Sequence, residues 1–285
     1  MTVHSSVLPD LERASALVAE RGLSLGKPLH LLGETTSTND EAKRGARSGA
    51  PHGATWVAES QSAGRGRQGR QWVSPRGENL LFSVLVRLSC PPSRLPPLAL
   101  VAGLAARDAI ARAAPGCEVG IKWPNDVVVG KERKKVAGVL VEAILQGRTV
   151  EALVVGIGIN VHTRVFPDEL APRATSIALL ASHPPDRAEV LADALSVLDR
   201  DLELAASRGL GLVHARLSSA DALRGEQVAS ERGEKGEEGD GGTAEGIDLE
   251  GRLLVRRPDG VLARWGAGEV HLVAGAGAGA TAPGR

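Results

Sequence analysis

The chain has 285 residues, of which 42% are hydrophobic, so it can bury a sizeable core in one large domain or in a main domain with a small second one. Because 34 Lys and Arg residues balance 34 Asp and Glu residues, the charge argues against bulk binding to nucleic acid. Cys90 and Cys117 match no metal-ligand spacing or disulfide framework, and the sequence has neither an apolar signal core nor a run of about 18 apolar residues. We therefore expect a cytoplasmic protein that does not enter a membrane.

Hydrophobic periodicity predicts helices and strands in mixed order. Helices are expected at 8–21, after the STN segment, at 96–114 and at 187–207. Strands are expected at 29–33, 54–59, 80–88, 119–129, 134–145 and 151–161. Ser37, Thr38 or Asn39 could cap the second helix, because each side chain offers an acceptor for free helix N–H groups. The strands mostly follow one another as hairpins, which predicts an α+β fold: a central mixed, mostly antiparallel sheet with helices packed on it.

The sequence changes in character after about residue 220. Short strand patterns separated by DG and LEG turn signals predict a small β-barrel at 221–275, after a main domain at 1–220. The stretch 231–242 holds five acidic residues and five glycines, which is typical of an exposed, mobile insertion. The low-complexity tail, 276–285, is expected to be disordered.

The loop GRGRQGR, residues 64–70, is the first candidate for chemistry. Its glycines free the backbone, and Arg65, Arg67 and Arg70 offer planar donor groups suited to phosphate or carboxylate. The loop is not a P-loop, because no Gly-Lys-Ser/Thr ends it, and the following QWVSP does not predict the helix that a dinucleotide-binding fingerprint needs. Taken alone, the loop could also be a solvated basic surface segment.

Three polar residues elsewhere are further candidates. In KWPND, Pro124 fixes a bend that brings Lys122 close to Asp126, whose carboxylate could hold Mg²⁺ or form a local ion pair in a structural turn. Lys135 precedes a buried strand, so it could enter a pocket or extend to solvent. Asn160 closes GIGIN, whose glycines either allow a close approach to the backbone or form a turn.

The order of these motifs resembles that of the biotin protein ligase family. The similar segments are STN (37–39), AESQSAGRGRQGRQW (58–72), SPRGENLLFSV (74–84), KWPND (122–126), KKVAGVLVE (134–142), GIGINV (156–161), and GIDLEGRLL and GAGEVHLV near the C-terminus. The resemblance covers roughly residues 28–275 and implies a biotin/lipoate ligase-like domain followed by a small SH3-like β-barrel.

The resemblance also implies an enzyme, its substrates and its site. The family joins biotin to ATP, with Mg²⁺, to form biotinyl-5′-AMP, and passes biotin to one lysine of a biotin carrier domain on a carboxylase. The implied biotin-side residues are Ser37, Thr38, Asn39, Gln61, Arg65, Gly66, Arg67 and Lys135. The implied nucleotide-side residues are Arg70, Lys122 and Asn160. Catalytic roles are implied for Lys135, Arg67 and Asp126, and Asp126 is also the candidate metal ligand.

Two alternatives accompany this interpretation. One is a lipoate or octanoate ligase of related fold, against which GRGRQGR together with KWPND argues. The other is a non-catalytic biotin sensor, against which the intact Lys135 and arginine loop argue. About 28 residues precede the first expected strand, too few for a winged-helix module, so no nucleic-acid binding is expected. The family includes monomers and homodimers, and both states are open for this chain.

Overall fold

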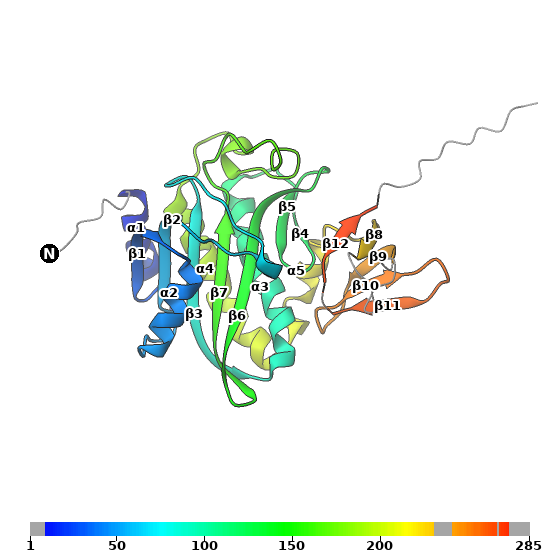
Figure 1. Cartoon of the computed structure of the whole chain (residues 1–285), viewed down its shortest axis with the longest axis horizontal. Helices are drawn as coiled ribbons and strands as arrows, with labels where there is room; N and C mark the ends of the chain where they lie inside the picture. The colour runs from blue at the N-terminus through cyan, green and yellow to red at the C-terminus, as the bar shows by residue number, and fades with distance from the viewer. Residues whose placement is uncertain (1–8, 231–240, 267, 274–285) are drawn as a thin grey trace, which may run out of the picture.

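Two sheets organise the chain (Figure 1). The computed structural model describes residues 9–230, 241–266 and 268–273. The large sheet has strand order β1-β2-β3-β7-β6-β5-β4, in which β1 and β2 are parallel and all other neighbours are antiparallel. Its strands are β1 (Leu29–Thr35), β2 (Thr55–Gln61), β3 (Leu80–Cys90), β4 (Val119–Lys122), β5 (Asp126–Val129), β6 (Lys134–Gln146) and β7 (Thr149–Ile159). The predicted mixed, mostly antiparallel sheet is confirmed.

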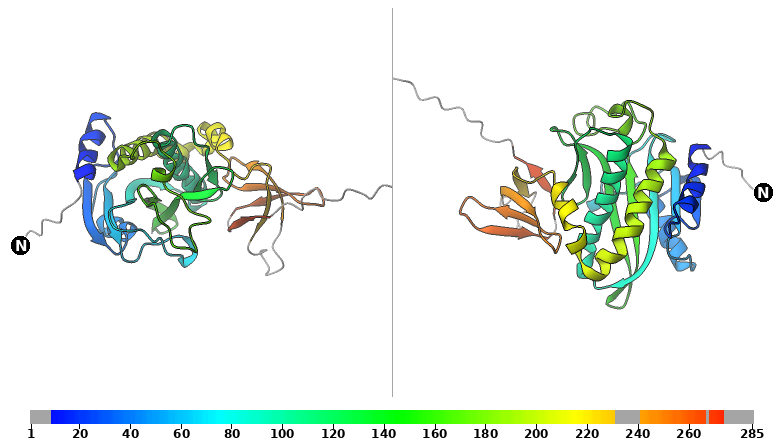
Figure 2. Two further views of the ribbon diagram at one scale, coloured as in Figure 1. Left: turned by 90° about the horizontal axis from the view of Figure 1, so that it is seen from above. Right: turned by 180° about the vertical axis from the view of Figure 1, so that it is seen from behind.

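Helices cover the two faces of this sheet unequally. The helices are α1 (Pro9–Glu20), α2 (Thr38–Arg47), α3 (Leu95–Ala113), α4 (Arg187–Arg208) and α5 (His214–Ser219), with short 3₁₀ turns η1 (Arg67–Gly69), η2 (Pro92–Arg94), η3 (Ile177–Leu179) and η4 (Leu210–Leu212). The long helices α3 and α4 lie side by side across the back of the sheet (Figure 2, right) and bury their apolar residues in the main core. On the opposite face α2 packs through Ala42 against Trp56, Leu85 and Val154. The part of that face not covered by α2 is left for a site.

One predicted strand, 119–129, is wrong. The bend at Trp123-Pro124-Asn125 divides it into β4 and β5, which pair antiparallel and place Lys122 directly opposite Asp126. Proline has no N–H for a sheet ladder and holds a fixed φ, so a continuous strand cannot pass through this position. The proximity of Lys122 and Asp126 that the bend predicted is confirmed.

The second sheet is small and wholly antiparallel, as expected for the C-terminal part. Its order is β11-β10-β9-β8-β12, with strands β8 (Gln227–Ser230), β9 (Gly241–Ile247), β10 (Leu253–Arg256), β11 (Leu262–Trp265) and β12 (Val270–Leu272). Residues 231–240 of the predicted insertion and the predicted tail at 276–285 lie outside the described residues. Gly241 and Gly242, the last two residues of that insertion, belong to β9. The domain boundary at 220/221 stays a prediction.

The two parts touch where the KWPND bend meets the small sheet. The indole Nε1 of Trp123 donates a hydrogen bond to the Gly251 carbonyl at 2.9 Å. Gly251 has φ +79°, and a Cβ there would lie 3.1 Å from Cα of Pro97 in α3. Glycine is therefore needed both for the turn conformation and for the close approach to α3.

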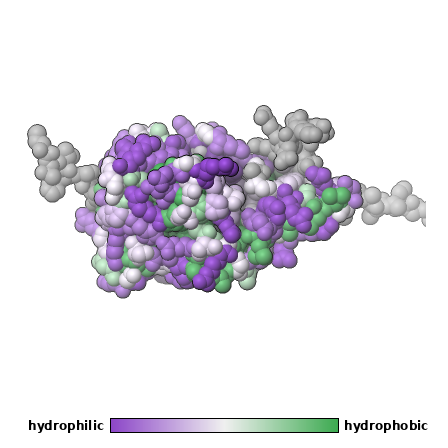
Figure 3. All heavy atoms as spheres, turned by 90° about the horizontal axis from the view of Figure 1, so that it is seen from below, coloured by the Kyte–Doolittle hydropathy of each residue, from purple (hydrophilic) through white to green (hydrophobic). Residues whose placement is uncertain are grey.

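The surface seen in Figure 3 is mainly hydrophilic, with hydrophobic residues in smaller areas between charged ones. Within the part of the chain that the structure describes, no helix is long and apolar enough to cross a membrane.

Candidate active site

A cleft lies on the face of the large sheet opposite α3 and α4. The connection between β2 and β3 crosses in front of β7 and β6 (Figure 1) and forms the outer wall of the cleft. The start of α2, strands β6 and β7, and the KWPND bend form the remaining walls. Apart from Asn160 and the GIDLEGRLL segment, the motifs of the sequence analysis therefore contribute to one cavity, although its lining runs from Ser37 to Val270 along the chain.

Glycines in β6 and β7 make the floor of the cleft flat. A Cβ on Gly158 would lie 2.6 Å from the Trp72 ring, and a Cβ on Gly156 would lie 2.1 Å from Oδ1 of Asn39. A Cβ on Gly138 of β6 would likewise lie 3.1 Å from the side chains of Trp72 and Lys135. The glycines of GIGIN thus allow a close approach to the backbone, and the groups that approach are the side chains of Asn39 in α2 and of Trp72, which follows the arginine loop.

The closed end of the cleft is formed by the start of α2. Ser37 occupies the N-cap position, but its side chain makes no capping hydrogen bond. Instead, Oε1 of Gln61, at the end of β2, accepts the Thr38 backbone N–H at 2.7 Å. Ser37, Thr38 and Asn39 are all nearly buried. Gln61 at the end of β2 therefore accepts a hydrogen bond that the sequence analysis expected from the capping residues of α2 themselves. The side chains of Ser37, Thr38 and Asn39 line the cavity instead.

The arginine loop is folded back on itself. The N–H of Trp72 donates to the Gly64 carbonyl at 2.9 Å, and the N–H of Gly66 donates to the Arg70 carbonyl at 2.7 Å. Gln68, with φ 54°, lies at the tip of the turn that both hydrogen bonds enclose. This hairpin-like geometry explains why the segment does not begin a helix, as the sequence indicated.

The three arginines of the loop extend to different walls of the cleft. Arg65 binds Asp40 of α2 at 2.5 Å, which fastens the loop to the closed end. Arg67 donates to Oδ1 of Asn125 in the KWPND bend at 3.3 Å. Arg70 forms an ion pair with a glutamate of the C-terminal part, Glu269. The loop is consequently closed over the cleft, and its charges are spread along it.

Positive charge concentrates at the centre of the cleft. Nζ of Lys135 lies 2.6 Å from Oδ1 of Asp126 and 5.5 Å from the centre of the Trp72 ring. Burial lowers the pKa of Lys122, and the positive charges of Lys135 and Arg70 lower it further, against the opposing effect of Asp126. A lysine whose pKa is depressed in this way gains from a bound anion, so the centre of the cleft is suited to phosphates or a carboxylate.

Arg67 shares this environment. Burial lowers its pKa, Asp126 opposes that effect and Arg70 adds to it. The guanidinium nevertheless stays protonated at neutral pH, because an arginine side chain loses its proton only under strongly alkaline conditions. Arg67 is therefore a permanent, partly desolvated cation next to the paired Lys135 and Asp126.

A second cavity of about 840 Å³ opens beside the first and shares its central residues. The shared residues are Arg70, Gln71, Trp72, Lys122, Asp126, Lys135 and Glu269. Asn160 lines this second cavity, where its Nδ2 donates to the Thr175 carbonyl at 3.0 Å. The outer wall comes from the segment 163–174, including Phe166 and Leu170, which carries no periodic pattern and was not predicted to form part of the site.

Other neighbours of the cleft were also missed by the sequence analysis. Trp72 was noted only as a residue following the loop, yet its indole Nε1 is buried without a hydrogen-bond partner among the described residues. Asn125 and Glu269 hold the loop arginines, and Glu142 binds Asn39 and Lys43 behind the closed end. All four residues lie within the quoted motifs, but the sequence analysis gave none of them a role in the site.

Among the residues that the structure describes, Asp126 and Glu269 are the only carboxylates that line the cleft, and each is paired with a cation. The described residues contain no group of three His, Cys, Asp or Glu side chains that could hold a metal by themselves. Oxygen ligands suit Mg²⁺, which commonly binds one or two carboxylates together with substrate phosphates. Asp126 and Glu269 are therefore the described carboxylates that could hold a magnesium ion, in exchange for their present cationic partners.

The fold and the cleft define a protein that binds a small anionic compound on the open face of a mixed sheet. Residues 32–160 match the Biotin/lipoate A/B protein ligase family, and residues 225–273 match the Biotin protein ligase C terminal domain. The chain is 34% identical over 238 residues to the biotin--[acetyl-CoA-carboxylase] ligase of Paracoccus denitrificans, covering 81% of this chain and 95% of that relative. The chain belongs to the biotin protein ligase family.

Two further comparisons agree. The chain is 37% identical over 169 residues to the bifunctional ligase/repressor BirA of Bacillus spizizenii, which covers 59% of this chain and 51% of that relative. The match thus spans about half the length of that bifunctional relative. The solved structure of biotin protein ligase from Aquifex aeolicus in complex with biotin and ATP superposes with a TM-score of 0.72 at 32% identity, covering 87% of this chain and 99% of that one.

Proposed function

We propose that the protein activates biotin with ATP, giving biotinyl-5′-AMP and pyrophosphate, and then transfers biotin to a lysine of a biotin carrier domain. The observation that carries this proposal is the polarity of the cleft. One closed end offers neutral hydrogen-bonding groups, the centre is cationic, and a second cavity continues beyond it. Biotin has a neutral ureido ring at one end and a carboxylate at the other, and the nucleotide would occupy the second cavity.

The carboxylate end of biotin belongs next to Lys135. This lysine and Arg67 supply fixed positive charge at the centre of the cleft. The ureido ring then faces the closed end, where Ser37, Thr38, Asn39 and Gln61 supply hydrogen-bonding groups. Arg65 and Gly66 border biotin from the loop side. An aliphatic substrate such as octanoate would leave these polar groups without partners, which costs binding free energy.

In the first reaction a carboxylate oxygen of biotin attacks the α-phosphorus of ATP, and the bond to pyrophosphate breaks. The two anions repel each other, and Lys135, Lys122 and Arg70 offset that repulsion without having to reorganise. Asp126 and Glu269 are the carboxylates that would hold a magnesium ion, which would supply neutralisation of phosphate charge. Asn160 borders the nucleotide side from the second cavity.

The closed loop protects the product. Biotinyl-5′-AMP is a mixed anhydride that water would hydrolyse, so it has to be sequestered until a carrier arrives. The loop is fixed at both ends, by Arg65 on α2 and by Arg70 on Glu269, and Arg67 binds the bend between them. Opening and closing of this loop would control release of the intermediate.

In the second reaction the neutral amine of a carrier lysine attacks the acyl carbon, the bond to AMP breaks, and the amine gives up a proton. We propose Asp126 as the acceptor of that proton. Besides its proposed roles as metal ligand and proton acceptor, Asp126 positions Lys135 through their ion pair. Transfer from preformed biotinyl-5′-AMP by Asp126→Asn separates the roles: an unchanged transfer rate would exclude Asp126 as the proton acceptor.

The partner of the reaction is a biotin carrier domain, and the proposed place of action is the cytoplasm, which supplies ATP. All proposed site residues come from one chain, so the mechanism does not require a homodimer. The test of the function is biotin transfer to a purified carrier domain, detected by intact mass with biotin and MgATP present. A mass increase only with lipoate or octanoate would assign the chain to a different ligase activity.

A further inference from the structure

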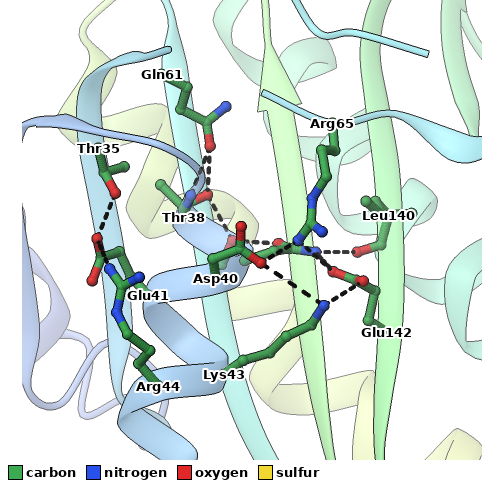
Figure 4. A network of polar contacts seen from close by, with 12 residues as sticks. Thr35, Thr38, Asp40, Glu41, Lys43, Arg44, Gln61, Arg65, Leu140 and Glu142 are labelled. Atoms are coloured by element: carbon green, nitrogen blue, oxygen red, sulfur yellow. Dashed lines mark hydrogen bonds and ion pairs between the residues drawn. The ribbon is translucent and has the colours of Figure 1, made fainter. Parts of the chain in front are cut away.

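Glu142 of β6 lies behind the closed end of the cleft and binds several of the residues there (Figure 4). Its Oε2 accepts a hydrogen bond from Nδ2 of Asn39 at 2.7 Å, and its Oε1 accepts one from Nζ of Lys43 at 2.5 Å. Arg65 of the loop approaches the same carboxylate at 3.4 Å. Glu142 does not line the cleft itself. Its influence on a ligand must therefore pass through Asn39 and Arg65.

The carboxylate fixes the direction of a chain of hydrogen bonds. An ionised carboxylate only accepts, and so does the Leu140 carbonyl, which lies 3.3 Å from Nδ2 of Asn39. Asn39 therefore turns its NH₂ group toward Glu142 and Leu140 and its Oδ1 toward Ser83. Oγ of Ser83 lies 2.5 Å from that Oδ1 and 2.7 Å from Oγ1 of Thr38. Because Oδ1 cannot donate, the one hydroxyl proton of Ser83 belongs to Asn39. The Thr38 hydroxyl also lies 3.2 Å from Oε1 of Gln61, but its contact with Ser83 is shorter, so its one proton is directed at Ser83.

This direction determines what the cleft offers a ligand. With its proton directed at the buried Ser83, the Thr38 hydroxyl presents lone pairs and can accept. Oε1 of Gln61 is already used by the Thr38 N–H, which leaves the Nε2 group of Gln61 as a donor. The closed end therefore offers both an acceptor and a donor, and a ureido ring, with N–H donors and one carbonyl acceptor, complements that pair.

We propose that Glu142 is a positioning residue that sets the donor and acceptor pattern of the biotin end of the cleft through Asn39, Ser83 and Thr38. This inference rests on the proposed function. Burial disfavours the charged form of Glu142, but hydrogen bonds from Lys43 and Asn39 and the charges of Lys43 and Arg65 outweigh that effect, so its pKa lies below its ordinary value. The carboxylate is ionised at neutral pH, as the directional argument requires.

The test compares biotin with 2-iminobiotin, in which an N–H group replaces the ureido oxygen. Glu142→Gln keeps the shape of the side chain, but its amide can face Asn39 with either its oxygen or its nitrogen, which leaves the Leu140 carbonyl, at 3.3 Å, as the remaining fixed acceptor for the Asn39 NH₂ group. Calorimetric titration without ATP should show biotin binding weakened about 10-fold, the effect of one hydrogen bond to a charged group. Binding of 2-iminobiotin should change less than about 2-fold, so that the preference for biotin falls.

Two controls separate this role from a merely structural one. Glu151→Gln removes another glutamate of the same sheet, paired with Arg87 at 3.4 Å and outside the cleft, and should change neither affinity. Lys43→Gln removes the cation that pairs with Glu142 but leaves the bond to Asn39, so the preference for biotin should persist. Thermal unfolding of each variant checks that it is folded.

Each outcome decides the inference. The inference would be overturned if a folded Glu142→Gln variant kept the parental ratio of biotin affinity to 2-iminobiotin affinity. It would also be overturned if Glu142→Gln and Lys43→Gln both lost affinity equally for the two ligands. If the parent protein binds no biotin at all, the proposed function fails and this inference with it. Biotin binding by the parent with a reduced preference in Glu142→Gln alone is the result that supports the inference.

Discussion

Nζ of Lys135 lies 2.6 Å from Oδ1 of Asp126, and the Lys135 ammonium also stands 5.5 Å from the centre of the Trp72 ring. This pair joins β6 to the KWPND bend at the point where the two cavities meet. It puts the lysine where a substrate carboxylate and a phosphate would face each other.

Replacing Lys135 by alanine should slow formation of biotinyl-5′-AMP by about 10²–10³-fold, as expected for the loss of one preorganised charge contact. Pre-steady-state pyrophosphate release at saturating biotin and MgATP measures this step. Lys134→Ala is the matched control, because Lys134 pairs with Glu132 at 3.1 Å away from the cleft. Near-normal pyrophosphate release by Lys135→Ala would remove Lys135 from the reaction.

Arg67→Gly should let biotinyl-5′-AMP escape faster and raise non-specific biotinylation of bystander proteins. The substitution removes the 3.3 Å contact with Asn125 that ties the middle of the loop to the bend. The release rate of the adenylate from the purified complex is the quantity to measure. Arg76→Gly, in the same connection but paired only loosely with Glu34 at 3.8 Å, should release it at the parent rate. Equal release by both variants would contradict the lid role.

Lys122→Met should weaken MgATP binding while making the folded protein more stable near neutral pH. Burial, with the charges of Lys135 and Arg70, holds the pKa of Lys122 below its value in the unfolded chain. Between those two pKa values the unfolded chain binds more protons, so the free energy of unfolding rises with pH across that alkaline window. Below the window the charged lysine is a cost, and methionine removes it.

Thermal unfolding as a function of pH, with MgATP affinity measured in parallel, tests this prediction. The parent should gain stability as the pH rises through the window, and Lys122→Met should be more stable at neutral pH and lack that rise. Lys131→Met, in the exposed turn after Gly130, should match the parent in both measurements. A Lys122→Met variant with parental MgATP affinity would contradict its place on the nucleotide side.

Gly251→Ala should destabilise the protein more than Gly260→Ala. Both glycines have positive φ, +79° and +84°, so each substitution costs about 1–2 kcal/mol of backbone strain. A Cβ on Gly251 would also meet Pro97 of α3 at 3.1 Å, whereas the space at Gly260 is open. The extra cost, about 1–3 kcal/mol for overpacking, would appear in denaturant unfolding. Equal losses of unfolding free energy in the two variants would mean that Pro97 and its helix shift to accommodate the added methyl group without cost.

Local patterns in the sequence predicted most of the sheet and all of the long helices, because periodicity and turn residues act over short distances. They failed at the KWPND bend, where a run of apolar residues hid a division into β4 and β5. They also missed the wall at 163–174, whose irregular chain gives no periodic signal. Its position depends on tertiary contacts such as the hydrogen bond from the Lys135 N–H to the Arg173 carbonyl at 2.8 Å, which no local rule reports.

The same limit applies to the site. The arginine loop, Lys122, Asp126 and Lys135 were predicted from residue type and order, and the fold brings them to one cleft. Glu142 and Glu269 were not, because each meets its partners only through tertiary contacts: Glu142 with Asn39 of α2, and Glu269 with Arg70 of the loop. A charged residue within a recognisable motif can be identified from the sequence. The oppositely charged residue that pairs with it from a distant helix or strand cannot.

The most direct test of the account is pyrophosphate release from MgATP with biotin, lipoate or octanoate as the only carboxylic acid. The account predicts release with biotin alone, because only its ureido ring satisfies the polar closed end while its carboxylate reaches Lys135. Release with lipoate or octanoate but not biotin would contradict the assigned substrate. Biotin binding without any pyrophosphate release would contradict the assigned reaction.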